Sequence, residues 1–169
     1  MSAGGYPAVH EMILACVDGS TGGYAAMAEA AELAKRFSSR IIVLSVEEGL
    51  PRYAGTIGEV DEFKREKDEF FAGVDRQAAR IAVEHGAKVE RFEIRIGHAA
   101  DVIVHFVDEI HADLVVMGYK GHSRIARFVI GTTAQKVNAY SKASVLIVKP
   151  TQETEHLWQD GPSPRSPSA

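Results

Sequence analysis

The sequence predicts an α/β protein built on an open five-stranded parallel sheet with helices on both faces. Short apolar runs that are rich in β-branched residues alternate along the chain with longer segments of helical periodicity. The segments between successive runs are too long for hairpin turns, so we expect parallel strands joined by crossovers. The chain has 169 residues, which is the usual length of a single domain.

The first part of the chain is expected to form two strands and one helix. Residues 12–18 form the first strand, an apolar run that ends in an acid. A hydroxyl from Ser20 or Thr21 can then cap a helix over residues 24–37. Residues 41–46 form the second strand and are apolar almost throughout, as is typical of strands covered on both faces. The inner face of the helix carries Met27, Ala30, Ala34 and Phe37.

A loop and a charged helix follow the second strand. Residues 49–58 contain several glycines and a proline, which indicates a loop. Gly86 stands where a glycine is expected to cap the end of the charged helix. The apolar face of this helix is formed by Phe70, Val74, Ala78, Ile81 and His85.

The last three strands differ in their patterns. Residues 88–96 alternate between apolar and charged side chains, which predicts a strand with one wet face near a sheet edge. Residues 114–118 form the fourth strand, a short helix covers about 133–140, and 145–148 form the fifth strand. The third strand places Phe92, Ile94 and Ile96 on one side and Arg91, Glu93 and Arg95 on the other. The third helix presents Ile103, Phe106, Val107 and Ile110 on its apolar stripe.

Composition excludes several classes of protein. The net charge of -4 and the pI near 6.0 argue against a nucleic-acid-binding protein, which carries a basic patch on a basic domain. The single cysteine, Cys16, rules out an intramolecular disulfide and is expected to be a core residue. No apolar stretch approaches the ~18–20 residues that span a membrane, and the first residues lack a signal peptide's features. We therefore expect a cytoplasmic protein.

Three glycines lie close to the ends of predicted elements. Gly118 and Gly121 follow the fourth strand and allow the backbone to approach a ligand. Gly131 precedes a helix, whose free N–H groups and dipole favour an anion, and Thr132 adds a hydroxyl. Asp18 closes the first strand, where a carboxylate can accept bonds from ribose hydroxyls or adenine. Because ligands of open parallel sheets bind where the strand order reverses, these residues indicate a nucleotide crevice.

Cations between the glycines fit the same interpretation. Lys120, Arg124 or Arg127 can offset the charge of a phosphate, although the two arginines equally suit a solvated helix face. Other chemistries lack their motifs: there is no H-E-x-x-H pattern, no Gly-x-Ser-x-Gly elbow and no Walker-type Gly-Lys-Ser/Thr.

The pattern Gly118-x2-Gly121-x9-Gly131-Thr132 resembles the nucleotide motif of the universal stress protein family. Residues 13–20 are similar to that family's first strand and turn, and the resemblance runs from about residue 11 to 150. It implies a Rossmann-like fold related to the adenine-nucleotide hydrolases, with five strands and four helices. It also implies a homodimer in the branch of the family that binds ATP.

The resemblance assigns roles to particular positions. It implies that Asp18 contacts the base and ribose end and that the main chain of Val46 meets adenine. The end of the fourth strand lines the ribose and phosphates, the loop after it holds the phosphates, and the turn at Gly131 holds the β and γ phosphates. The implied binding residues are Asp18, Val46, Met117, Gly118, Lys120, Gly121, Gly131, Thr132 and Thr133.

One position departs from the family pattern. Many ATP-binding members carry a further Ser or Thr where this chain has Ala134. Backbone amides can still hold phosphate, so we expect binding of ATP, ADP or AMP. Mg²⁺ or Mn²⁺ would be held mainly through the phosphates, with no metal site of the protein's own.

The fifth strand, residues 145–148, is apolar on both faces although this topology places it at an edge. An exposed apolar edge invites pairing. We expect the same strand of a second copy to cover it, giving a homodimer; the alternative is cover by the C-terminal tail.

Three functions fit the sequence. The preferred one is a nucleotide-binding regulatory stress-response protein, with no dedicated catalysis or at most weak ATPase activity; its protein partner is not indicated. The second is a dimeric interaction module that does not bind nucleotide. The third, an adenine-nucleotide hydrolase, is disfavoured because Asp18 and the residues after it do not form that enzyme's Ser-Gly-Gly-x-Asp-Ser loop. We expect a flexible N-terminus over 1–10, one domain over 11–150 and a disordered tail over 151–169.

Overall fold

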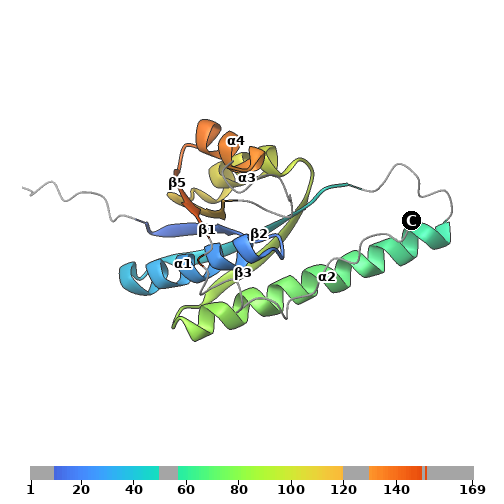
Figure 1. The fold of residues 1–169 in the computed structure, drawn as a ribbon, viewed down its shortest axis with the longest axis horizontal. Coiled ribbons are helices and arrows are strands. Elements are labelled where there is room, and N and C mark those ends of the chain that lie inside the picture. Colours follow the sequence, from blue (N-terminus) through green and yellow to red (C-terminus); the bar gives the residue numbers. More distant parts are fainter. Residues whose placement is uncertain (1–9, 50–56, 120–129, 150, 152–169) are drawn as a thin grey trace, which may run out of the picture.

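The computed structural model describes residues 10–49, 57–119, 130–149 and 151. Five parallel strands form one sheet in the order β3-β2-β1-β4-β5, which confirms the predicted fold class (Figure 1). The elements are β1 (Met12–Cys16), α1 (Thr21–Phe37), β2 (Arg40–Glu47), α2 (Ile57–Glu84), β3 (Val89–Ile96), α3 (Ala99–Ile110), β4 (Leu114–Gly118), α4 (Thr132–Tyr140) and β5 (Ser144–Val148).

Two helical layers enclose the sheet. Helices α1 and α2 cover one face, and α3 and α4 cover the other (Figure 1). Each face has its own apolar cluster, because side chains alternate between the two faces along each strand. Thus Ile13 of β1 packs on the side of α1 and α2, whereas Leu14 packs on the side of α3 and α4.

The strand order places β1 at the centre of the sheet, between β2 and β4. The chain winds from β1 outward to β3 and then returns to β4 on the other side, so the order reverses between β1 and β4. Cys16 of β1 lies beside Met117 of β4 in the register. The loops that leave these two strands therefore start side by side, as ligand binding at a reversal point requires.

Helix α1 begins three residues earlier than predicted, at Thr21. Its N-cap is Ser20, whose hydroxyl accepts a hydrogen bond from the Gly23 N–H at 3.1 Å, which confirms the predicted hydroxyl cap. Phe37 was predicted to face the core but is 52% exposed. It is the last residue of the helix, beyond Ala34, where the apolar cluster ends. Its ring instead contacts His10 edge-on at 5.7 Å.

Helix α2 confirms the predicted apolar stripe in its C-terminal half. Val74, Ala78 and Ile81 are buried, and Phe70 packs against the same cluster. His85, also predicted on this stripe, lies beyond the last helical residue, with its Nδ1 2.9 Å from Glu32 Oε1. The predicted cap is also present, because Gly86 has a φ of +75°, a conformation that glycine adopts without steric cost. The segments expected to be flexible or disordered, 1–10 and 151–169, lie almost entirely outside the described residues. Among the described helices, none is long and apolar enough to cross a membrane.

Strand β3 lies at an edge, as predicted, and Arg91 is exposed while Phe92 packs on the core, but the predicted wet face is wrong in the second half of the strand. Ile94 and Ile96 are 43% and 73% exposed, while Glu93 and Arg95 on the other face are half-buried. The cluster under α1 and α2 reaches only to Phe92 in this strand. On the polar face, α3 partly covers the charged side chains, and Arg95 stacks on the ring of Phe106 at 5.0 Å.

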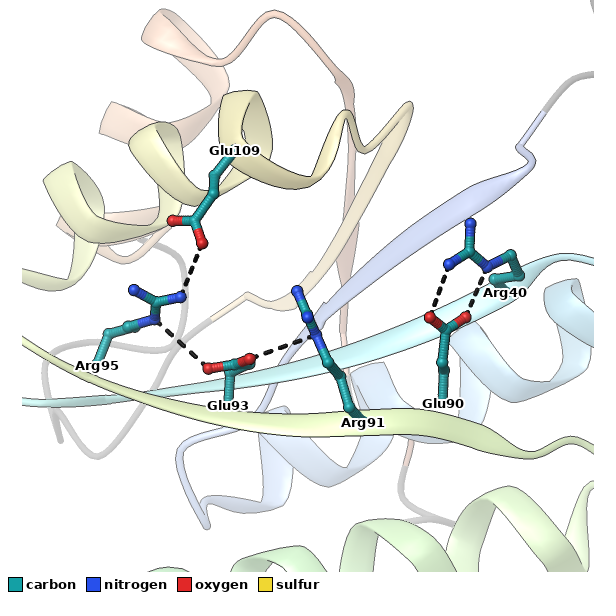
Figure 2. Close-up of polar contacts among 6 residues, drawn as sticks. All are labelled: Arg40, Glu90, Arg91, Glu93, Arg95 and Glu109. Atoms are coloured by element: carbon teal, nitrogen blue, oxygen red, sulfur yellow. Dashed lines mark hydrogen bonds and ion pairs between the residues drawn. The ribbon is translucent and has the colours of Figure 1, made fainter.

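The polar face of β3 carries a chain of ion pairs, drawn in Figure 2. Glu93 forms ion pairs with Arg91, at 3.3 Å, and with Arg95, at 3.6 Å, and Arg95 also donates a hydrogen bond to Glu109 of α3 at 2.8 Å. An irregularity in the register with β2 falls near the start of the strand, between Ile41 and Ile42. Charges and bulges are two ways in which edge strands avoid pairing with other chains.

A separate pair joins the starts of β2 and β3. Arg40 donates two hydrogen bonds of 2.6 Å to Glu90. These bonds, and secondarily the positive charges of Arg40 and Arg91, lower the pKa of Glu90 below 4.5. Because this pKa is lowered by folding, the pair stabilises the protein above pH ~4.5 and the contribution is lost as the pH falls through the folded-state pKa.

We predict that Arg40→Gln raises the pKa of Glu90 toward 4.5, because the charged hydrogen-bond donors are removed. The measurement is a carboxyl ¹³C NMR titration. Lys64→Gln, which removes an exposed cation of α2, is the matched control and should leave the Glu90 titration unchanged. Superimposable Glu90 curves for Arg40→Gln and the wild type would contradict the predicted coupling. Both side chains are exposed, so we expect little change in stability.

Candidate functional site

The carboxyl end of β4 packs directly against the first turn of α1. A Cβ added at Gly118 would lie 2.7 Å from the carbonyl carbon of Gly22 and 2.8 Å from its oxygen. Both neighbours are backbone atoms, which cannot rotate away. Gly118 was predicted to leave room for a ligand, and its contact with α1 is a second reason for glycine at this position.

Gly118→Ala is expected to lower the free energy of unfolding by about 1–3 kcal/mol, as overpacked sites do. Equilibrium urea denaturation measures this change. Gly58→Ala is the control, because a Cβ at Gly58 meets nothing within 4 Å and alanine favours the helix. If both variants were as stable as the wild type, β4 and α1 would not be in the close contact described here.

Asp18 follows β1 and is held by the loop that leads into α1. Its Oδ1 accepts hydrogen bonds from the Ser20 N–H, at 3.0 Å, and from the Ser20 hydroxyl. Ser45 of β2 donates its hydroxyl to the carbonyl of Val17, which ties this loop to β2. The carboxylate is therefore fixed at the carboxyl end of the sheet, beside the ends of β1, β2 and β4.

The start of α4 is joined to the same carboxyl end of the sheet through Tyr119. The Gly131 N–H donates to the Tyr119 carbonyl at 2.9 Å, and the Tyr119 N–H donates to the Val148 carbonyl at 2.8 Å. These bonds bring Gly131 next to the end of β4, although residues 120–129 separate them in the chain. The first and last parts of the predicted glycine motif therefore lie together.

The N-terminus of helix α4 lies at this carboxyl end of the sheet. An α-helix leaves the N–H groups of its first residues without intrahelical partners. The Gly131 N–H bonds to Tyr119, and the next N–H groups belong to Thr132, Thr133 and Ala134. The side chain of Thr132 is exposed and that of Thr133 is half-buried. This end of the helix can attract an anion through backbone donors and the helix dipole.

Two of the predicted binding residues, and the position that departs from the family pattern, lie in the apolar cluster beneath α3 and α4. Val46 and Met117 both pack in it, and Ala134 lies there with 2% exposure. A hydroxyl at position 134 would enter this apolar environment, where a polar group without a partner is costly. The structure thus gives a packing reason for alanine at position 134, where the pattern of the ATP-binding branch led us to expect Ser or Thr.

Lys120 and Gly121, predicted to form the phosphate loop, lie outside the described residues, as do Arg124 and Arg127. Ser20, Gly23 and Tyr119 were not predicted as site residues. The first could have been found from the sequence, because a serine two residues after an aspartate is a common local hydrogen-bonding pair. The contacts of the other two depend on tertiary structure.

Two potential nucleophiles near Asp18 are held in their neutral forms. Burial raises the pKa of the Cys16 thiol from 9.0 to about 12, and the charge of Asp18 adds to the shift. Burial also raises the pKa of the Tyr24 hydroxyl, again with a smaller contribution from Asp18. Cys16 was predicted to be a core residue; it packs against the apolar cluster but is only half-buried. A neutral thiol is a weak nucleophile.

Fold and geometry together define a doubly wound α/β protein in which β1 and β4 end side by side at the topological switch point. A family model described as the universal stress protein family matches residues 11–149. The chain belongs to this family.

Similar proteins span nearly the whole chain. Universal stress protein MJ0531 of Methanocaldococcus jannaschii is 28% identical over 146 residues, which is 83% of each chain. A crystal structure of a universal stress protein in complex with cAMP is 27% identical, covers 83% of this chain and 97% of that one, and has a TM-score of 0.60. Universal stress protein UspA from Lactobacillus plantarum, at 23% identity, covers 84% and 99% of the two chains with a TM-score of 0.74.

Proposed function

We propose that this protein is a regulatory stress-response protein that binds an adenine nucleotide (ATP, ADP or AMP), as in the ATP-binding branch of its family. The observation that carries the proposal is that two features lie at the same carboxyl end of the sheet. Asp18 is fixed at the end of β1, and the N-terminus of α4 is held beside the end of β4 through Tyr119.

The two features suit opposite ends of a nucleotide. A carboxylate accepts hydrogen bonds from ribose hydroxyls or the adenine amino group. The N-terminus of α4 offers backbone donors to the phosphates at Gly131, Thr132 and Thr133. In this proposal the main chain of Val46 meets adenine, and Met117 and Gly118 form the floor, with Lys120 and Gly121 at the phosphates.

The relative that binds cAMP supports a purine nucleotide as the ligand, because its structure holds an adenine ring, a ribose and a phosphate. Within the described residues, no three His, Cys, Asp or Glu side chains gather closely enough to hold a metal ion. We propose that Mg²⁺ or Mn²⁺, where present, is held through the phosphates.

We further propose that the protein does not catalyse a dedicated reaction and hydrolyses ATP slowly at most. Cys16 and Tyr24 near the site have raised pKa values, so neither supplies a ready nucleophile. The lack of a ready nucleophile at these two residues fits a nucleotide-binding regulator better than a dedicated enzyme, and we propose that it acts in the cytoplasm.

We propose that two copies associate through β5. Among the described strands, β4 is the only neighbour of β5, and the side chains of Val145, Leu146, Ile147 and Val148 are half-buried. Apolar side chains on an open sheet edge favour pairing with a second copy.

The proposed nucleotide binding is tested by denaturing the freshly purified protein and identifying released nucleotides by chromatography, followed by calorimetry with ATP, ADP and AMP. We expect an adenine nucleotide in at least one of the two measurements. Absence of released nucleotide together with absence of calorimetric binding would favour the alternative, a dimeric interaction module that works without nucleotide.

A further inference from the structure

We propose that Ser20 and Gly23 are positioning residues that set the Asp18 carboxylate for recognition of the ribose hydroxyls of the nucleotide. The inference rests on the proposed nucleotide binding. It assigns to the first turn of α1 a role in ligand selectivity, which goes beyond its role in starting the helix.

Ser20 holds Asp18 with two donors. Its N–H and its hydroxyl both donate to the same oxygen, Oδ1. The hydroxyl oxygen accepts in turn from the Gly23 N–H at 3.1 Å. A hydrogen-bond chain therefore runs from the N-terminus of α1 through Ser20 to the carboxylate. Because both bonds end on one oxygen of one short side chain, they fix the plane and the direction of the carboxyl group.

Gly23 supplies the space for that carboxyl group. A Cβ at Gly23 would lie 2.6 Å from Asp18 Oδ1 and 3.0 Å from the Asp18 backbone nitrogen. Glycine inside a helix is unfavourable relative to alanine, so its presence in the first turn of α1 runs against local propensity. The position of Asp18 explains it: any side chain at residue 23 would push the carboxylate away from Ser20.

A carboxylate fixed in this way can select its ligand. An ionised carboxylate has about four lone-pair sites, so it can accept hydrogen bonds from Ser20 and from ligand hydroxyls at the same time. A site built to bond a hydroxyl rejects an analogue that lacks it, because the protein group is left unpaired. The position of Asp18 should therefore determine how strongly ATP is preferred over 2′-deoxy-ATP and 3′-deoxy-ATP.

The first test is Gly23→Ala, with affinities for the three nucleotides measured by calorimetry. We expect ATP affinity to fall about tenfold or more, and the preference for ATP over the deoxy-nucleotides to fall toward one. The urea midpoint should fall, because the new Cβ crowds the Asp18 backbone nitrogen at 3.0 Å and displaces Oδ1 from Ser20, and circular dichroism should show that the fold is kept. A wild-type preference in Gly23→Ala would overturn the inference.

The second test separates capping of α1 from positioning of Asp18. Ser20→Asp keeps a side chain that caps the helix well, but it cannot donate to Asp18 and it repels the carboxylate. We expect a folded protein with the same loss of affinity and preference, and we expect Ser20→Thr, which keeps the hydroxyl, to restore both. Equal binding by Ser20→Asp and the wild type would contradict a positioning role for Ser20.

Nucleotide binding and the positioning role of Ser20 and Gly23 are tested separately. If the wild type binds none of the three nucleotides, both the proposed function and this inference are wrong. If the wild type binds ATP with a preference over the deoxy-nucleotides and the variants keep that preference, the inference alone is wrong.

Discussion

Gly131→Val is expected to abolish nucleotide binding while leaving the fold intact. The backbone at Gly131 has φ -60° and ψ 145°, values that any L residue adopts, so valine can occupy the N-cap without backbone strain. Its branched side chain would stand before the first N–H groups of α4, where we place the phosphates. Loss of two hydrogen bonds to a charged group, about 1.5–3 kcal/mol each, corresponds to at least a ~100-fold weaker affinity.

Calorimetric titration with ATP measures the loss, and circular dichroism with size-exclusion chromatography checks fold and assembly. Asn138→Val introduces the same side chain at an exposed position of the same helix and should bind like the wild type. Full affinity in Gly131→Val would show that the phosphates lie elsewhere. It would not affect the assignment of the chain to its family.

Val145→Pro is expected to convert the proposed dimer into monomers. The N–H of Ser144 donates to the Asp113 carbonyl, and the carbonyl of Val148 accepts from Tyr119, so both residues direct their backbone groups toward β4. Because these directions alternate along a strand, the N–H groups of Val145 and Ile147 point to the open edge. Proline at 145 removes an outward donor without breaking the β4–β5 ladder.

In a symmetric pair the substitution acts twice. Two buried carbonyls lose their partners, at about 1–3 kcal/mol each, and dimer affinity should fall at least ~30-fold. Light scattering coupled to size-exclusion chromatography, over a range of concentrations, measures the assembly. Val145→Ala shortens the side chain but keeps the N–H, so it is the matched control and should stay dimeric. A dimeric Val145→Pro protein would place the interface away from this edge.

Much of the fold could be predicted because local and tertiary preferences agree. The apolar runs became strands, Gly86 took the positive φ of a helix cap, and β5 lies at an edge. The errors fall where a periodic pattern continues past the element that covers it. Phe37 keeps the helical period but lies beyond the apolar cluster, and Ile96 keeps the strand period where the cluster no longer reaches.

The candidate site was predicted in outline, and its supports were not. Strand ends and helix starts can be located from the sequence, so Asp18 and Gly131 could be named. The fit of Gly118 against Gly22 depends on how closely α1 approaches β4. The link from Gly131 through Tyr119 to β5 depends on the strand order. Neither leaves a signal in a single sequence, because both join segments far apart in the chain.

The charged face of β3 has a consequence for how large an assembly can grow. A sheet with two open apolar edges could add copies at both and extend as a filament. Here one edge carries the chain of ion pairs from Arg91 to Glu109 (Figure 2) and an irregular register with its neighbour, both of which oppose further pairing. In the proposed dimer, growth through β5 would therefore stop after one addition, because the ion pairs of β3 oppose pairing at the opposite edge of the sheet.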